Sequence, residues 1–97
     1  MTTYIERVNA AAPGSVSTAA GASVLVLAVN PARRYACVCN DSDTVVYMAL
    51  FDTAEPHKGI RLAPNGGVYE MNYLNYYTGP ISVFCSAAGK NVSFVEG

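Results

Sequence analysis

The chain has 97 residues, a net charge of −1 and only 13% charged residues, about half the ~25% share of typical soluble domains. A chain of this length forms one domain with one hydrophobic core. The lack of a basic run argues against nucleic-acid binding, and apolar runs such as residues 24–29 are far short of the ~20 residues that cross a membrane.

The low charge has two explanations that the sequence leaves open. Another subunit covers part of the surface, or Ser, Thr, Asn and Tyr side chains solvate it. Residues 1–12 (MTTYIERVNAAA) lack a charged start followed by an apolar stretch, so we expect no secretory signal and synthesis in the cytoplasm.

Short segments of strand-like composition alternate with turn residues along the chain. Residues 1–22 contain Pro13-Gly14 and Gly21 and are expected to be an N-terminal arm or edge segment, with the β domain at 23–97. Strands are predicted at 2–8, 15–18, 23–29, 35–39, 44–50, 59–62, 68–72, 81–86 and 91–96. Turn signals at about every eight to twelve residues, without helical periodicity, predict an all-β fold: a small β-sandwich or jelly-roll-like barrel of roughly seven to nine short antiparallel strands.

Residues 34–50 are expected to be the centre of this fold. Strands 35–39 and 44–50 are predicted to form a hairpin around Asn40-Asp41-Ser42-Asp43, whose side chains favour turns. Both faces of the hairpin are apolar, which predicts that both are covered. A second hairpin is predicted at 59–72, because Asn65-Gly66 favours the positive φ of a tight turn.

Few residues are candidates for catalysis or metal binding. Cys37, Cys39 and Cys85 are an odd number, which argues against a disulfide framework; they lack the spacing of a zinc site and are expected to be small buried hydrophobes. Asp41 and Asp43 lack the spacing of a calcium-binding loop. His57 stands apart from any nucleophile that it could activate, so we expect no enzyme, no metal and no cofactor.

Other residues are candidates for contacts with partner molecules. They are Tyr4, Ile5, Arg33, Arg34, Tyr73, Tyr76 and Tyr77. Tyrosine clusters are common at protein interfaces and on sugar-binding faces, although simple packing over a loop explains this one equally well. The two arginines are expected first as solvated charges at the start of a strand and only second as ligands.

The order of motifs from residue 30 to residue 97 resembles a group of small tailed-bacteriophage virion proteins. In that group an arginine-rich strand entry leads into an N-x-S-D-T turn and an aliphatic-tyrosine strand. A G-I-x-L-x-x-x-G-G-x-Y-E hairpin and a Y-T-G-x-I/V strand follow, and the chain closes on a valine-containing segment that ends in E-G. The matching residues are Asn40, Ser42, Asp43, Thr44, Tyr47, Gly59, Ile60, Leu62, Gly66, Gly67, Tyr69, Glu70, Thr78, Gly79, Ile81, Val92, Val95, Glu96 and Gly97. The first 29 residues carry none of these motifs.

The resemblance implies a non-enzymatic capsid decoration or cement protein on the capsid surface of the virion. Such a protein assembles as a homotrimer, binds the major capsid protein and stabilises the head shell. Residues 1–22 and the loops at 51–57 and 73–79 are expected to make the subunit and capsid contacts. The alternative is a carbohydrate- or receptor-binding module of a phage head or tail, with Tyr73, Tyr76 and Tyr77 as a stacking platform.

Overall fold

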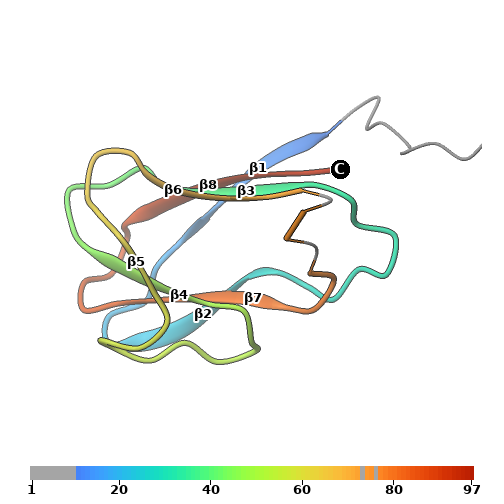
Figure 1. The fold of residues 1–97 in the computed structure, drawn as a ribbon. Coiled ribbons are helices and arrows are strands. Elements are labelled where there is room, and N and C mark those ends of the chain that lie inside the picture. Colours follow the sequence, from blue (N-terminus) through green and yellow to red (C-terminus); the bar gives the residue numbers. More distant parts are fainter. Residues whose placement is uncertain (1–10, 73, 76) are drawn as a thin grey trace, which may run out of the picture.

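The computed structural model describes residues 11–72, 74–75 and 77–97, which form eight strands and no helix. The strands are β1 (Ala12–Ser17), β2 (Ala22–Leu27), β3 (Ala36–Asn40), β4 (Val46–Ala49), β5 (Ile60–Leu62), β6 (Gly67–Met71), β7 (Ile81–Cys85) and β8 (Asn91–Glu96). They form two four-stranded antiparallel sheets, in the orders β1-β8-β3-β6 and β2-β7-β4-β5, stacked face to face (Figure 1). The predicted all-β sandwich is confirmed, whereas the strand expected at 2–8 lies outside the described residues.

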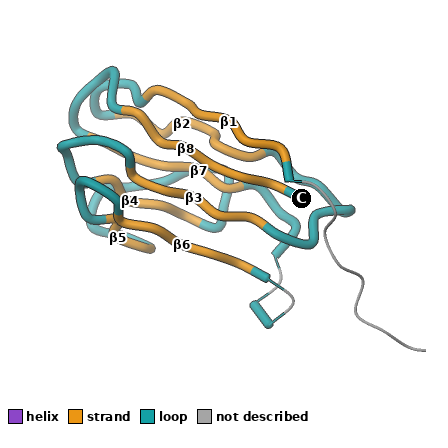
Figure 2. Tube along the Cα trace, turned by 90° about the horizontal axis from the view of Figure 1, so that it is seen from above, coloured by secondary structure: helices purple, strands orange, loops and turns teal. Residues whose placement is uncertain are grey.

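The pairing of the strands is that of a jelly roll. β1 pairs with β8, β2 with β7, β3 with β6 and β4 with β5, all antiparallel. Two further pairs, β3 with β8 and β4 with β7, complete the two sheets. Nested pairs of this kind make the double-sheet jelly roll, and Figure 2 shows the two sheets lying one above the other, with β1 and β2 along one side.

Both predicted hairpins are wrong. β3 and β4 lie in different sheets, and so do β5 and β6, so the turns at 41–45 and 63–66 cross from one sheet to the other. Asn65 and Gly66 do adopt positive φ angles of 60° and 114°. The Asn-Gly preference therefore predicts the local backbone correctly, but it does not determine whether the next strand returns beside the first or ~10 Å away in the facing sheet.

The core lies between the sheets and contains alternate residues of the strands. Its buried hydrophobic residues are Val26, Leu27, Ala36, Val38, Val46, Met48, Leu62, Met71, Ile81, Val83, Cys85 and Val92. In β3 the buried residues alternate with half-buried Cys37 and Cys39. The second apolar face of this strand therefore points outward, and the prediction that both faces are covered is wrong.

The described part of the N-terminal segment belongs to the sandwich. β1 is an edge strand that pairs with β8 from Ala12 to Ser17. Thr18 then anchors the turn into β2, because its backbone N–H donates to the Lys90 carbonyl at 2.9 Å.

Candidate interaction surface

The described residues leave the outer face of one sheet uncovered. In the β1-β8-β3-β6 sheet the outward side chains align across the four strands in two rows. The rows consist of Pro13, Val95, Cys37 and Glu70, and of Ser15, Ser93, Cys39 and Val68. We call these eight residues the open face; no described segment passes over them in either view of the fold (Figures 1 and 2).

The open face is nearly free of charge. Glu70 is the only charged residue in the two rows, and the Tyr35 hydroxyl donates a hydrogen bond of 2.8 Å to its Oε2 atom. That hydrogen bond, together with burial, raises the pKa of Tyr35 to about 12, so the hydroxyl keeps its proton and continues to solvate the carboxylate. Beside it, Val68 is 57% exposed. Depletion of charge around exposed apolar groups is characteristic of the central part of protein interfaces.

The three cysteines are free thiols. Cys85 is buried, as expected, but the same expectation is wrong for Cys37 and Cys39, which are half-buried on the open face. Burial, followed by the nearby Glu70 carboxylate, raises the pKa of Cys37. A thiol with a raised pKa is a weak nucleophile, so Cys37 contributes to this surface as a small apolar group.

The opposite sheet is covered in part by its own chain, although Leu25, the register partner of Ser82, is 49% exposed. The loop between β4 and β5 runs beneath the β2-β7-β4-β5 sheet (Figure 1). Ser82 Oγ donates to the Phe51 carbonyl at 2.9 Å, and the Ala54 N–H donates to Ser23 Oγ at 2.8 Å. Ala54 is 3% exposed as a result. Among the described residues, the β1-β8-β3-β6 sheet is therefore the one whose outer face no loop crosses.

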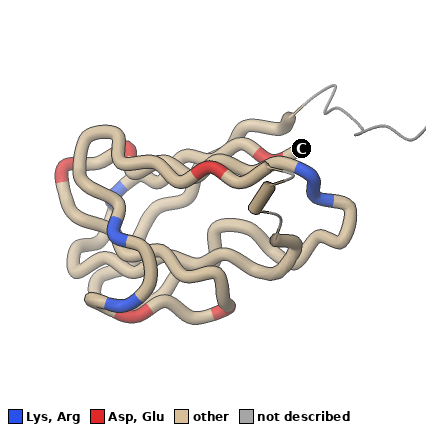
Figure 3. Tube along the Cα trace, viewed as in Figure 1, with Lys and Arg blue, Asp and Glu red and all other residues tan. Residues whose placement is uncertain are grey.

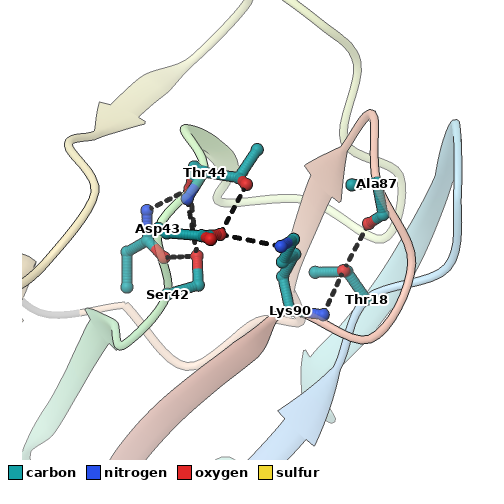
Figure 4. Close-up of polar contacts among 7 residues, drawn as sticks. Thr18, Ser42, Asp43, Thr44, Ala87 and Lys90 are labelled. Atoms are coloured by element: carbon teal, nitrogen blue, oxygen red, sulfur yellow. Dashed lines mark hydrogen bonds and ion pairs between the residues drawn. The ribbon is translucent and has the colours of Figure 1, made fainter.

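Four connections gather at one end of the sandwich, which we call the polar end. It holds a shallow concavity of about 400 Å³ lined by Asp41, Ser42, Asp43, Asn65, Gly89, Lys90 and Asn91. Lys90 Nζ lies 2.7 Å from Asp43 Oδ1, and its backbone N–H donates to Thr18 Oγ1 (Figure 4). The hydrogen bond from Lys90, and then that from Thr44, lowers the pKa of Asp43. Lys90 and Asp43 bind each other and thereby connect two of the loops that line this concavity.

Neither a cluster of metal ligands nor a membrane-crossing helix is found in the part of the chain that the structure describes. There, no group of three or more His, Cys, Asp or Glu side chains could hold a metal ion. None of the same residues lies in a helix that could cross a bilayer. His57 Nδ1 lies 2.9 Å from the Tyr47 hydroxyl, which fixes the covering loop on β4.

Arg33 is inside the protein, so its predicted solvated position is wrong. The side chain is 1% exposed. Its Nε donates to Glu96 Oε2 at 2.7 Å, Nη1 to the Gly79 carbonyl at 2.8 Å and Nη2 to the Ala28 carbonyl at 2.7 Å. All of these partners belong to the same chain. Arg33 therefore joins two connections, the one between β2 and β3 and the one between β6 and β7, to β8. Arg34, the next residue, is exposed and keeps its place as a candidate.

The predicted tyrosine platform is described only in part. Tyr77 is half-buried and packs against the core, and its hydroxyl donates to the Pro80 carbonyl at 2.9 Å. The ring and the hydroxyl of Tyr77 therefore both have partners within the fold. Tyr73 and Tyr76, like Tyr4 and Ile5, lie outside the described residues.

No family model, curated protein or solved structure matches the chain. What the protein does therefore has to follow from its own residues and surfaces.

Sequence reasoning missed the open face. Whether a sheet face is free depends on the path of the loop at residues 50–59, which no local pattern in the strands reveals. One signal was available: no charged residue occurs from residue 8 to residue 32. In Figure 3 the strands formed by this stretch, β1 and β2, carry neither blue nor red, and the charges lie at the two ends, on β5 and β6 and on the covering loop.

Proposed function

We propose that the chain is a non-enzymatic structural protein of a bacteriophage virion, a decoration or cement protein that binds the major capsid protein through the open face. The observation that carries the proposal is the alignment of eight outward side chains, of which only Glu70 is charged, on the uncovered sheet of the jelly roll. The order of motifs from residue 30 to residue 97 supports the virion setting. Double-sheet jelly rolls recur in viral capsid domains and in lectins, and because one fold serves many functions, the fold supports the proposal only by analogy.

The proposed mechanism needs no reacting group. A protein that binds the assembled shell, and not its separated subunits, stabilises the shell by mass action. A rigid, flat and weakly charged face suits this task, because little charge has to be desolvated and little side-chain entropy is lost on contact. Pro13, Ser15, Ser93 and the two thiols are short side chains that lose little freedom when they are covered.

The test compares binding of purified variants to shells that were assembled without this protein. Val68→Lys and Ser93→Lys place an ammonium group on the open face, and we expect each to weaken shell binding by more than about tenfold, because an unpaired buried charge is costly. Thr53→Lys is the control, since Thr53 is exposed on the loop that covers the other sheet. This control also tests the expectation that the loop at 51–57 touches the capsid.

Binding that is unchanged in both open-face variants would contradict the proposal. Loss of binding in Thr53→Lys alone would move the contact to the opposite side of the sandwich. All three positions lie outside the core cluster, so circular dichroism should be the same for each variant and the wild type, and a difference in binding can be assigned to the surface.

A further inference from the structure

One side of the sandwich consists of two neutral strand edges. Residues 11–32 carry no charged side chain and include β1 and β2, each of which has six residues. The two strands run along the same side of the molecule (Figure 2). Each is the last strand of its sheet, so its outer row of backbone N–H and C=O groups has no ladder partner within the described chain.

The two edges on the other side are protected in the ways that natural sheets use. β5 has only three residues and carries Arg61, and β6 carries Glu70. Short length and charged side chains both prevent edge-to-edge pairing. β2 is partly protected as well, because a register shift between Leu25 and Leu27 interrupts its ladder with β7. β1 pairs with β8 in unbroken register, and Pro13 is its main safeguard, since proline removes one backbone donor.

We propose that β1 is a self-association edge, which pairs antiparallel with β1 of a second copy of this chain across a twofold axis. Exposed backbone groups on an extended edge are met by another extended strand. A second copy fits because β1 has no charge that would select a charged partner, and because a twofold interface requires a surface that is complementary to itself. The result is one continuous sheet of eight strands made from two four-stranded sheets.

The side chains of β1 define the register of this pair. Directly opposed residues of an antiparallel pair point to the same face, so outward Ser15 has to meet an outward residue. Centring the axis on Ser15 places Ser15 opposite Ser15 of the second copy and Pro13 opposite Ser17. The inward Val16 then meets Gly14, over which the Phe94 ring of the same copy lies. A slip by one residue would oppose outward and inward side chains.

The pairing has two consequences for the assembly. It joins the open faces of two copies into one surface of twice the area, on the same side of the joined sheet. It also gives a dimer, whereas the phage resemblance implies a trimer. The inference does not depend on capsid binding, so a dimer that fails to bind shells would refute the proposed function and leave the self-association edge intact.

The experiment is sedimentation velocity of the full chain over a range of concentrations, with reductant present to prevent disulfides between copies. The wild type should show a concentration-dependent monomer–dimer equilibrium. Ser15→Lys and Ser15→Glu each place like charges opposite each other, and we expect the dissociation constant to rise by about fivefold in each, the upper range for such pairs. An equimolar mixture of the two variants should recover at least wild-type affinity, because opposite charges then face each other.

The matched control is Ser93→Lys. Ser93 is the register partner of Ser15 and lies on the same face, one strand further from the edge, so its replacement should leave the dimer unchanged. A wild type that is monomeric at every concentration, or trimeric, would overturn the proposal. Equal effects of Ser15→Lys and Ser93→Lys would also overturn it, as would a mixture that fails to recover affinity.

Discussion

Nε of Arg33 donates a hydrogen bond of 2.7 Å to Oε2 of Glu96 and thereby joins the segment before β3 to the last residue of β8. The guanidinium is buried and Glu96 is 24% exposed. Two further donors of the same group bind the carbonyls of Gly79 and Ala28. One side chain thus provides hydrogen-bond donors to acceptors on β8 and on two connections, which would otherwise lack these donors.

Replacing Arg33 by Met should therefore destabilise the fold strongly. We expect a loss of about 3 kcal/mol in the free energy of unfolding, the lower end of the range for removing one partner of a buried ion pair, because Glu96 stays partly solvated. Urea unfolding measures the loss. Arg61→Met, an exposed arginine on β5, is the control and should change stability by less than about 0.5 kcal/mol. Similar losses of unfolding free energy in the two variants would contradict a stabilising role of the Arg33 hydrogen bonds.

The close packing of Gly14 against Phe94 is expected to make the fold sensitive to any added volume at residue 14. A Cβ atom on Gly14 would lie 2.4 Å from Cζ of the Phe94 ring, its register partner on β8. Gly14→Ala should cost about 1–3 kcal/mol through overpacking. In a Phe94→Leu background the same change should cost at least about 0.5 kcal/mol less, a coupling that a double-mutant cycle detects. Additive losses would show that the ring does not limit the size of residue 14.

The sequence predicts the positions of most described strands but not their partners. The segment expected at 81–86 appears as Ile81–Cys85 and that at 91–96 as Asn91–Glu96, because β-branched residues bounded by Gly, Pro and Asn are local signals. β3 pairs with β6 and β8 instead of β4. That choice depends on which apolar faces come together in the core, and no turn residue encodes it.

Arg33 shows a similar limit for the candidate site residues. Average exposure predicts a solvated arginine, whereas its carboxylate partner is 63 positions away and the Gly79 carbonyl comes from another connection, 46 positions away. Burial of a charge depends on such distant groups, so the sequence near Arg33 does not reveal it. The open face likewise depends on a distant segment, because the loop at 50–59 passes over the other sheet.

The side-chain amide of Asn40 is expected to be essential for the stability of the fold. The residue is fully buried, and Nδ2 donates to the carbonyls of Thr44 at 2.8 Å and Leu62 at 3.0 Å. Asn40→Asp puts an acceptor against those two carbonyls. We expect the free energy of unfolding to fall by more than about 3 kcal/mol, because each lost hydrogen bond costs more than about 1 kcal/mol and burial of a charge adds to this.

The control for Asn40→Asp is Asn30→Asp. Asn30 uses its side-chain Oδ1 as an acceptor from the Ala32 N–H, a role that aspartate keeps, so the change in unfolding free energy should stay within about 0.5 kcal/mol. Chemical denaturation of both variants makes the comparison. Equal stabilities would mean that the Asn40 amide does not hold the crossing turn.

The Lys90–Asp43 contact should make the stability of the polar end dependent on pH. The pKa of Asp43 is lowered in the folded state, so its contribution is fully present above the unfolded pKa of about 3.9 and is lost as the pH falls through the lower folded pKa. The melting temperature of the wild type should exceed that of Asp43→Asn by a constant margin above about pH 5, and the margin should shrink below about pH 4.

In a Lys90→Met background the pH dependence should largely vanish, because the largest cause of the lowered pKa has been removed. Thermal unfolding at a series of pH values tests this, and an equal margin at both ends of the series would exclude the ion pair as the source of stability.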